Sequence, residues 1–197
     1  MPHTPRAASL DKVRVASPAD AAALAEIYAP YVRDTAVSFE VDPPDQAEMR
    51  RRLERLLPRF PWLACERNGE VVGYAYASPH RERLAYQWSA DATVYVSREA
   101  HRSGVGRSLY GSLLRSLQRQ GFRTVYGGIT LPNEGSVGLH EAMGFRPIGV
   151  YREVGFKLGA WRDVGWWSLP LGAASPNPQP PRPFEPRLID PAGTAAV

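Results

Sequence analysis

The sequence predicts a mixed α/β domain in which helices flank a predominantly antiparallel sheet, with one strand-loop-helix unit near the sheet centre. Segments with helical and strand-like periodicity alternate along residues 12–171. A tight-turn pair, Asn68-Gly69, joins two strand-like segments. Leucines recur every four residues within 104–120. The flanks differ from this body: residues 1–11 are expected to form a disordered lead, and the proline-rich residues 172–197 an extended tail.

The first elements are defined by their ends. A strand is expected over residues 12–16, and Ser17 then caps a helix that carries Pro18 at its first position. A second helix begins after Asp45, whose side chain suits an N-cap, and ends at Pro58. These signals predict two helices before the first long strand of the sheet.

A β-hairpin follows, with strands over residues 62–66 and 71–77 and the turn at Asn68-Gly69. Its first strand contains Cys65, the only cysteine of the chain. Because no activating group adjoins this thiol, we expect a buried small residue and not a catalytic nucleophile.

The second half contains the strand-loop-helix unit and a closing hairpin. Gly121 suits a left-handed C-terminal cap, and Asn133 caps a short helix that ends near Met143. The closing hairpin is expected to be packed by its tryptophans, Trp161, Trp166 and Trp167. The remaining expected elements are a strand over 88–96, a loop over 97–103, a helix over 104–120, a strand over 123–130, and hairpin strands over 148–158 and 161–171.

Composition excludes several classes of protein. The 197 residues are 44% hydrophobic and 22% charged, which fits one compact domain. No apolar run approaches the roughly 18 to 20 residues that a membrane span needs. A secretory segment is absent from the first residues, so a cytoplasmic protein is expected. One cysteine and four scattered histidines give no metal site. Nucleic-acid binding is supported only by the net charge of +4 and is not expected.

The segment after the strand over 88–96 carries the strongest chemical signal, His101-Arg102-Ser103-Gly104-Val105-Gly106-Arg107. A glycine-containing turn that opens a helix directs backbone N–H groups outward at the positive end of the helix dipole, which suits a diphosphate. Two arginines add positive charge around these amides. A tight turn that needs its glycines for geometry alone is the alternative interpretation.

This loop resembles the acetyl-CoA motif of the GNAT superfamily of N-acetyltransferases, Gln/Arg-x-x-Gly-x-Gly/Ala, with His101 as a departure from its first position. Further segments are similar to those of the phosphinothricin N-acetyltransferases within that superfamily, from about Val13 to Leu171. They are Phe60-Pro-Trp-Leu, Gly69-Glu-Val-Val-Gly-Tyr-Ala-Tyr-Ala, Ala92-Thr-Val-Tyr-Val-Ser, Leu131-Pro-Asn, Leu139-His-Glu-Ala-Met-Gly-Phe and Val154-Gly-Phe-Lys-Leu-Gly-Ala-Trp-Arg-Asp-Val-Gly. The resemblance implies a GNAT fold with a splayed central sheet, and acetyl-CoA as cosubstrate.

The same resemblance implies how the cosubstrate is held. The backbone of Val94 and Val96 would contact the pantetheine arm, and Tyr95 would lie beside the thioester as one of the catalytic residues. Asn133 and Ser136 would approach the cosubstrate from beyond the next strand. The diphosphate would lie on the loop formed by Arg102, Ser103, Gly104, Val105, Gly106 and Arg107.

Acetyl transfer to an amine needs a group that removes the ammonium proton. Two titratable residues stand at catalytic positions of the family, Asp91 and His140. The phosphinothricin enzymes have Glu where Asp91 stands, so we expect the shorter side chain to act through one water. His140 is expected to serve as base or as acid toward the thiolate. The alternatives are a strand-end carboxylate bonded to backbone and a partly buried helix histidine.

The acceptor is expected to contact a loop in which Arg81 and Arg83 are able to bind a carboxylate and a phosphinate. Phe39 and Tyr86 match positions near the family's acceptor pocket. A solvated loop and core aromatic residues are the alternatives for these four residues.

The activity implied is transfer of acetyl to the α-amine of a small anionic amino-acid analogue such as L-phosphinothricin, and hence herbicide resistance. Methionine sulfoximine, methionine sulfone or another small amine are the alternative acceptors. A non-catalytic acyl-CoA-binding module whose proline-rich tail recruits a partner is a different class of function. The family resemblance also implies a homodimer.

Overall fold

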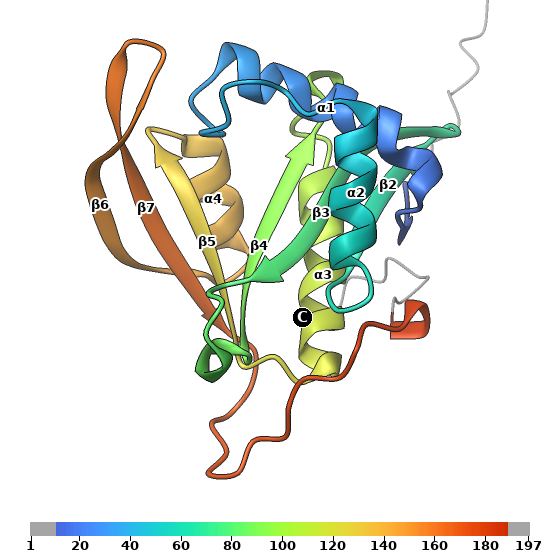
Figure 1. The fold of residues 1–197 in the computed structure, drawn as a ribbon, viewed down its shortest axis with the longest axis vertical. Helices are drawn as coiled ribbons and strands as arrows, with labels where there is room; N and C mark the ends of the chain where they lie inside the picture. The colour runs from blue at the N-terminus through green and yellow to red at the C-terminus, as the bar shows by residue number, and fades with distance from the viewer. Residues whose placement is uncertain (1–10, 189–197) are drawn as a thin grey trace, which may run out of the picture.

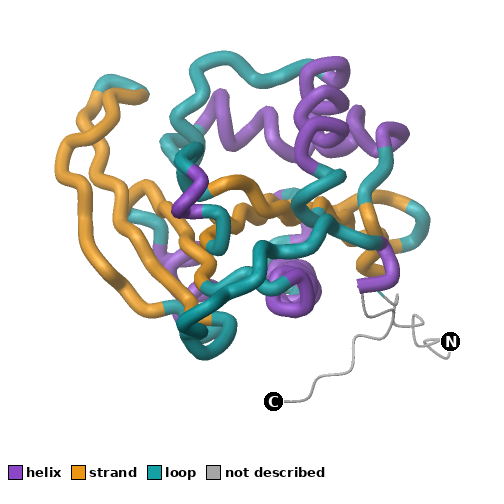
Figure 2. The backbone as a smooth tube through the Cα atoms, turned by 60° about the horizontal axis from the view of Figure 1, so that its bottom comes forward, coloured by secondary structure: helices purple, strands orange, loops and turns teal. Residues whose placement is uncertain are grey.

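The computed structural model describes residues 11–188, which form a seven-stranded sheet with helices on both faces (Figures 1 and 2). The strand order is β1-β2-β3-β4-β5-β7-β6. The strands are β1 (Lys12–Val15), β2 (Trp62–Arg67), β3 (Glu70–Pro79), β4 (Ser89–Val96), β5 (Thr124–Leu131), β6 (Arg146–Lys157) and β7 (Ala160–Pro170). The α-helices are α1 (Ala21–Asp34), α2 (Gln46–Leu56), α3 (Val105–Gln120) and α4 (Glu134–Ala142).

The sheet is antiparallel except at its centre, which confirms the predicted fold class. β4 and β5 run parallel and pair only over Ser89–Asp91 and Thr124–Tyr126. Beyond this contact the two strands diverge, as the ribbon in Figure 1 shows. The splayed sheet implied by the family resemblance is therefore present.

Two hydrophobic cores lie on opposite faces of the sheet. Ala90, Ala92 and Val125 pack into the core that contains the buried leucines of α3. Tyr95 packs against the other core, which contains the buried residues of α1 and α2. Because side chains alternate along a strand, Asp91 and Tyr126 point to the α1/α2 face.

Turn and cap signals agree closely with the structure. Asn68 and Gly69 adopt φ angles of 55° and 84° at the β2–β3 turn, and Gly121 caps α3 with a φ of 95°. The first helix differs from the expectation, because residues 18–20 form a 3-10 turn before α1 begins. The Asp20 carboxylate accepts the Ser17 N–H at 2.7 Å and two N–H groups of Arg14 at 2.8 Å, which holds this turn.

Cys65 is completely buried on β2, as expected from its sequence context. Burial raises the pKa of its thiol to about 11, so the reactive thiolate is scarce at neutral pH. Within residues 11–188, no helix combines the length and the apolar character that crossing a bilayer requires.

The closing hairpin is only partly packed, and the expectation for Trp161 was wrong. Trp167 is buried at 6% exposure, whereas Trp161 is 61% exposed. The Trp161 ring contacts the Phe156 ring, with 5.4 Å between their centroids, near the hairpin tip. Phe156 pairs with Trp161, and the next pair towards the turn is Lys157 with Ala160. Because side chains alternate along a strand, Trp161 points away from the face on which Lys157 is buried.

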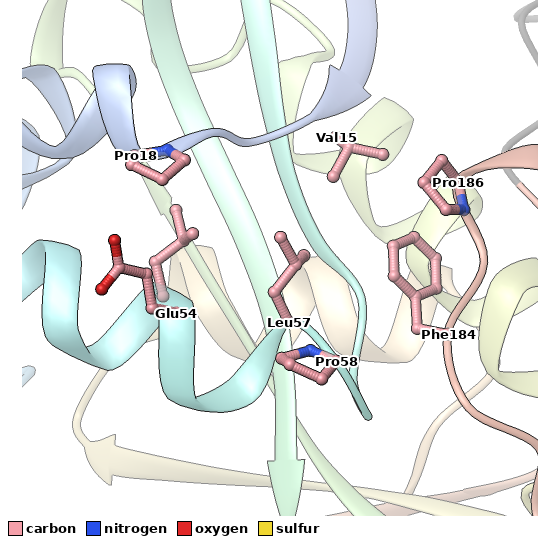
Figure 3. Close-up of a pocket in the computed structure, with 8 residues that line it drawn as sticks. Val15, Pro18, Glu54, Leu57, Pro58, Phe184 and Pro186 are labelled. Atoms are coloured by element: carbon pink, nitrogen blue, oxygen red, sulfur yellow. The ribbon is translucent and has the colours of Figure 1, made fainter.

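The described part of the tail runs along the domain. Arg182 N donates to Gln120 O at 2.9 Å, and Trp88 Nε1 donates to Gln179 O at 2.9 Å. Phe184 is buried, and with Pro186 it forms one side of an apolar groove of about 380 Å³ whose opposite side includes Leu57 (Figure 3). A 3-10 turn over Pro186–Leu188 ends this segment.

Both predicted flanks extend past the described residues. The predicted lead, residues 1–11, lies outside them except for Asp11, and the final part of the predicted tail, residues 189–197, lies outside them entirely. The Asp11 carboxylate accepts from Arg67 Nε at 2.6 Å, which ties this residue to the end of β2.

A buried lysine fixes the loop between α1 and α2. Lys157, at the end of β6, is 8% exposed, and its Nζ donates to the carbonyl oxygens of Val32, Ser38 and Glu40 at 2.6, 2.6 and 2.7 Å. One cation thus satisfies three backbone acceptors and joins the hairpin to the α1/α2 layer.

We predict that Lys157→Met lowers the free energy of unfolding by about 2–4 kcal/mol, because three buried carbonyl groups lose their donor. Urea unfolding followed by tryptophan fluorescence measures this loss. The chain offers one matched control, Lys12→Met, because its other lysine is exposed on β1. Equal stability of the two variants would contradict the role assigned to Lys157.

Candidate active site

The divergence of β4 and β5 creates a wedge, defined here as the space between the two strands beyond the last paired residues, Asp91 and Tyr126. Ser97 N donates to Val72 O at 2.9 Å, so Ser97, which follows the last residue of β4, bonds to β3 through its backbone. In an antiparallel pair every second residue does so, which makes Tyr95 the next one. The backbone groups of Val94 and Val96 consequently point away from β3, into the wedge. An exposed strand edge of this kind is able to bind an extended ligand as an added strand.

Two tyrosine hydroxyls lie against carbonyl groups at the ends of this edge. Tyr31 Oη donates to Val96 O at 2.5 Å, and Tyr110 Oη lies 3.2 Å from Ala92 O. Val94 lies between these two positions, so its N–H and C=O face the wedge between these two carbonyls.

The predicted anion loop lies at the open end of the wedge. Arg102 and Gly104 have φ angles of 57° and 89°, and α3 begins at Val105. The Ser103 hydroxyl donates to Ala100 O at 2.7 Å and accepts from Arg67 at 3.0 Å, which holds the loop in shape. The first amides of α3 have no partner within the helix, and the exposed Arg107 lies beside them.

Gly106 determines how closely α3 approaches its neighbours. A Cβ atom at this position would lie 3.2 Å from Leu139 Cδ2 on α4 and 3.9 Å from Val96 Cγ2 on β4. The absent side chain therefore leaves space where the two helices meet the strand edge. These residues fit a ligand with a diphosphate at the loop and an extended arm along β4.

On the α3/α4 face, His140 lies at the vertex of the wedge and is 3% exposed. Its Nδ1 donates to Ser136 O at 2.8 Å, and its Nε2 lies 3.0 Å from Tyr110 Oη. Asn133 caps α4 through a 3.1 Å bond from Ser136 N. Burial lowers the pKa of His140, which keeps the ring neutral at neutral pH.

On the α1/α2 face, the vertex holds a pair of side chains that the sequence analysis did not single out together. His80 Nδ1 lies 2.6 Å from Asp91 Oδ1, and the His80 ring stacks on Tyr126 with 4.2 Å between centroids. Burial raises the pKa of Asp91, while the His80 hydrogen bond and the charge of Arg81 act in the opposite direction.

His80 is the residue that sequence reasoning missed. It stands at the start of the acceptor loop, and only the register of the β3–β4 hairpin, in which Pro79 pairs with Ala90, brings it to Asp91. The available signal was that His80 follows the last residue of β3, and that the next strand, β4, carries Asp91.

The acceptor residues predicted from the sequence separate into two groups. The Arg81 guanidinium lies 5.6 Å from the Trp166 ring centroid, and the Tyr86 ring is 6.0 Å from His80, so both adjoin the Asp91 pair. Arg83 is exposed at the start of a 3-10 turn, and Phe39 packs against the backbone of Gly155 on β6.

A hollow of about 750 Å³ lies between α2 and the end of β3. It reaches β3 at Ser78, the cross-strand partner of Asp91, and its wall includes Arg55, Arg59 and Glu82. The wall also holds Glu40, Glu48 and Arg52, so the hollow has a mixed charge and reaches the vertex through Ser78.

Tyr95 is not brought together with the other predicted catalytic residues. Its ring packs against Tyr28, Tyr31 and Tyr74, with centroids 4.7, 5.1 and 5.5 Å away. Burial raises its pKa well above the ordinary tyrosine value. It lies on the face opposite His140, and about 13 Å along β4 from Asp91 at the usual rise per residue.

Residues 13–166 match the model of the acetyltransferase (GNAT) domain. The chain belongs to the GNAT acetyltransferase family. It is accordingly an N-acetyltransferase, and the expectation from the sequence is confirmed at that level.

Relatives and solved structures agree with this assignment. The phosphinothricin N-acetyltransferase of Streptomyces viridochromogenes is 43% identical over 175 residues, 89% of this chain and 93% of that protein. An L-methionine sulfoximine/L-methionine sulfone acetyltransferase of Salmonella typhimurium is 32% identical, over 81% of this chain and 94% of that protein. The crystal structure of a Sinorhizobium meliloti phosphinothricin acetyltransferase in complex with acetyl-CoA is 32% identical, with a TM-score of 0.82, and covers 91% of this chain and 97% of that one.

We predict that Gly127→Ala displaces His140, because the new Cβ would lie 2.5 Å from His140 Nε2. The expected cost is about 1–3 kcal/mol in the free energy of unfolding, together with a lower rate of acetyl transfer. Denaturant unfolding and thiol-release kinetics measure the two effects. Gly138→Ala on α4 is the matched control: a Cβ there meets nothing within 4 Å, so we expect unchanged or slightly higher stability.

Proposed function

We propose that this acetyltransferase transfers acetyl from acetyl-CoA to the α-amine of a small anionic amino-acid analogue, with L-phosphinothricin as the foremost candidate. The observation that carries the proposal is the arrangement at the vertex, where a half-buried carboxylate, Asp91, lies beside Arg81 at the inner end of the wedge. The identity to phosphinothricin N-acetyltransferases supports this choice of acceptor.

Cosubstrate binding is assigned to the residues around the wedge. The backbone of Val94 and Val96 would hold the pantetheine arm, and the loop from Arg102 to Arg107 the diphosphate. Asn133 and Ser136 would contribute to cosubstrate binding mainly by holding α4 in place. The Asn133 side chain caps that helix by accepting from Ser136 N, and Ser136 O accepts from His140. When bound, acetyl-CoA supplies an activated acetyl thioester.

Side-chain and backbone groups of the chain would then remove the amine proton and stabilise the oxyanion that forms at the thioester carbonyl. Asp91 and His140 flank the vertex from opposite faces, and the amine must lose a proton there before it reacts. His140 already uses both ring nitrogens within the protein, which favours the Asp91 side for proton removal. The N–H of Val94, turned into the wedge, is the candidate donor to an oxyanion. Tyr95 would support β4 from the α1/α2 face and not touch the reacting atoms.

Recognition of the acceptor is assigned to the surface around Asp91. Arg81 would bind an anionic group of the acceptor, with Arg83 extending from the same loop. Tyr86 would line the same surface, and Phe39 would shape the side formed by β6.

A second candidate acceptor is L-methionine sulfoximine or L-methionine sulfone, which the Salmonella typhimurium relative acetylates according to its name. The neutral aromatic surface of Tyr126 and Trp166 beside His80 favours a less charged side chain of this kind. In both cases we place the enzyme in the cytoplasm, and herbicide resistance follows where L-phosphinothricin is the acceptor.

The proposal includes a homodimer formed through β6. This strand is an edge of the sheet, and seven apolar side chains on β6, the turn and the start of β7 are 41–63% exposed. They are Ile148, Val150, Tyr151, Val154, Phe156, Leu158 and Trp161. An apolar edge of this size favours a second copy of the chain.

We predict that the purified protein releases CoA thiol from acetyl-CoA fastest with L-phosphinothricin, and more slowly with methionine sulfoximine, methionine sulfone, polyamines or peptide N-termini. Continuous thiol detection gives kcat/KM for each amine. Highest kcat/KM for methionine sulfoximine would move the assignment to the second acceptor. Binding of acetyl-CoA without thiol release from any amine would instead support a non-catalytic acyl-CoA-binding module.

We also predict that Phe156→Lys combined with Trp161→Lys weakens dimerisation by at least about tenfold, because two apolar side chains become charged at the proposed interface. Sedimentation velocity over a concentration series measures this change. Val41→Lys, at a position 80% exposed on the α1–α2 loop, is the control and should leave the dimer intact. A monomeric parent protein would refute the interface.

A further inference from the structure

His80 occupies an unusual place in the fold. Its ring touches both residues of the last β4–β5 pair, because Nδ1 lies 2.6 Å from Asp91 Oδ1 and the ring stacks on Tyr126 at 4.2 Å. The two ring planes are inclined by only 20°. The imidazole therefore lies across the point where the strands part, on the α1/α2 face of the vertex.

The hydrogen bond to Asp91 determines the tautomer of the His80 ring. A carboxylate oxygen accepts from Nδ1–H, which places the lone pair of the neutral imidazole on Nε2. A carboxylate on Nδ1 also stabilises the imidazolium that forms when Nε2 gains a proton. The other titratable or charged groups around the ring are Tyr126 from β5 and Arg81 and Tyr86 from the loop, while β7 contributes the neutral Trp166.

We propose that His80 is the base that accepts the ammonium proton of the acceptor, and that Asp91 is the positioning residue behind it. This assignment rests on the proposed function. An aspartate is one methylene shorter than a glutamate, and the imidazole extends the reach of the carboxylate toward the vertex. The expectation that Asp91 acts through a water is replaced by a pair of side chains in direct contact.

The proton and bond changes balance without a further reactant. One proton passes from the ammonium nitrogen to His80 Nε2, which leaves a lone pair on the amine. That pair forms the new N–C bond at the thioester carbonyl, and the C–S bond breaks. The sulfur leaves with its electron pair and takes the second nitrogen proton, so the products are the N-acetyl compound, CoA thiol and one proton on His80.

His140, on the other face, is a poor candidate for the same task. Its Nδ1 donates to Ser136 O, and its Nε2 lies against Tyr110 Oη in a site that is 3% exposed. A proton on Nε2 would remove the acceptor for that hydroxyl and place a charge in an apolar core. Of the two histidines at the vertex, His80 is thus hydrogen-bonded to a carboxylate, whereas His140 is bonded to a carbonyl and a hydroxyl group.

The test uses His80→Gln, Asp91→Asn and the double variant, with Asp42→Asn at an exposed loop position as the matched control. With the best acceptor at pH 7, His80→Gln should lower kcat about 10²- to 10⁴-fold with little change in KM for acetyl-CoA. The acid limb of the pH profile of kcat/KM should disappear in His80→Gln and persist in His140→Gln. The double variant should be no slower than His80→Gln alone, because the two residues act as one unit.

A second measurement does not depend on turnover. In the free enzyme, ¹⁵N imidazole spectra should show one ring in the Nδ1–H tautomer whose signals are lost in His80→Gln. Asp91→Asn should convert that ring to a mixture of tautomers. If His80→Gln unfolds, His80→Asn supplies the same comparison.

Each outcome separates this inference from the proposed function. Retention of the acid limb and of most of kcat in a folded His80→Gln variant would overturn the base assignment, as would an Nε2–H tautomer for His80. Failure of the parent enzyme to acetylate any amine would refute the proposed function, and the spectra would still decide whether His80 and Asp91 form the proposed pair.

Discussion

The three-residue parallel contact between β4 and β5 is the constraint on which the site depends. Where it ends, β4 retains a free edge, and the two faces of the sheet come within reach of one point. The helix on one side then supplies amides at the open end of the wedge, while side chains from both faces meet at its closed end. A longer ladder would have filled this space with backbone hydrogen bonds and left no free strand edge.

Keeping the wedge open requires partners for the carbonyl groups that lost a strand neighbour. Tyr31, from α1, bonds the carbonyl of Val96, and Tyr110, from α3, approaches that of Ala92. The Tyr31 hydroxyl therefore replaces β5 as the donor to Val96, while the Tyr110 hydroxyl, which donates to His140 Nε2, lies beside the carbonyl of Ala92. The strand edge between these two positions stays available. The aromatic packing around Tyr31 and Tyr110 positions these donors as well as filling the cores.

Local signals in the sequence were sufficient for most of the fold. The turn at Asn68-Gly69 and the cap at Gly121 depend on backbone conformations that few residues adopt, so they were predictable from short segments. His80 and Trp161 were not. His80 contacts a carboxylate on the partner strand of its hairpin, which no local pattern indicates. The exposure of Trp161 follows from the register of β6 and β7, which places it on the face opposite the buried Lys157. The site residues that act through long-range contacts are the ones that periodicity and spacing do not reveal.

The carbonyl cage around Lys157 has a chemical consequence for a protein that handles acetyl thioesters. Such thioesters acylate accessible, unprotonated lysine amines without any enzyme. The chain has only two lysines, and the Nζ of one of them is enclosed by three carbonyl oxygens. Its other residues that carry a full positive charge at neutral pH are arginines, whose guanidinium groups stay protonated. Lys12 is therefore the single lysine that self-acetylation would readily reach, so the enzyme keeps its positive charge in the presence of its own cosubstrate.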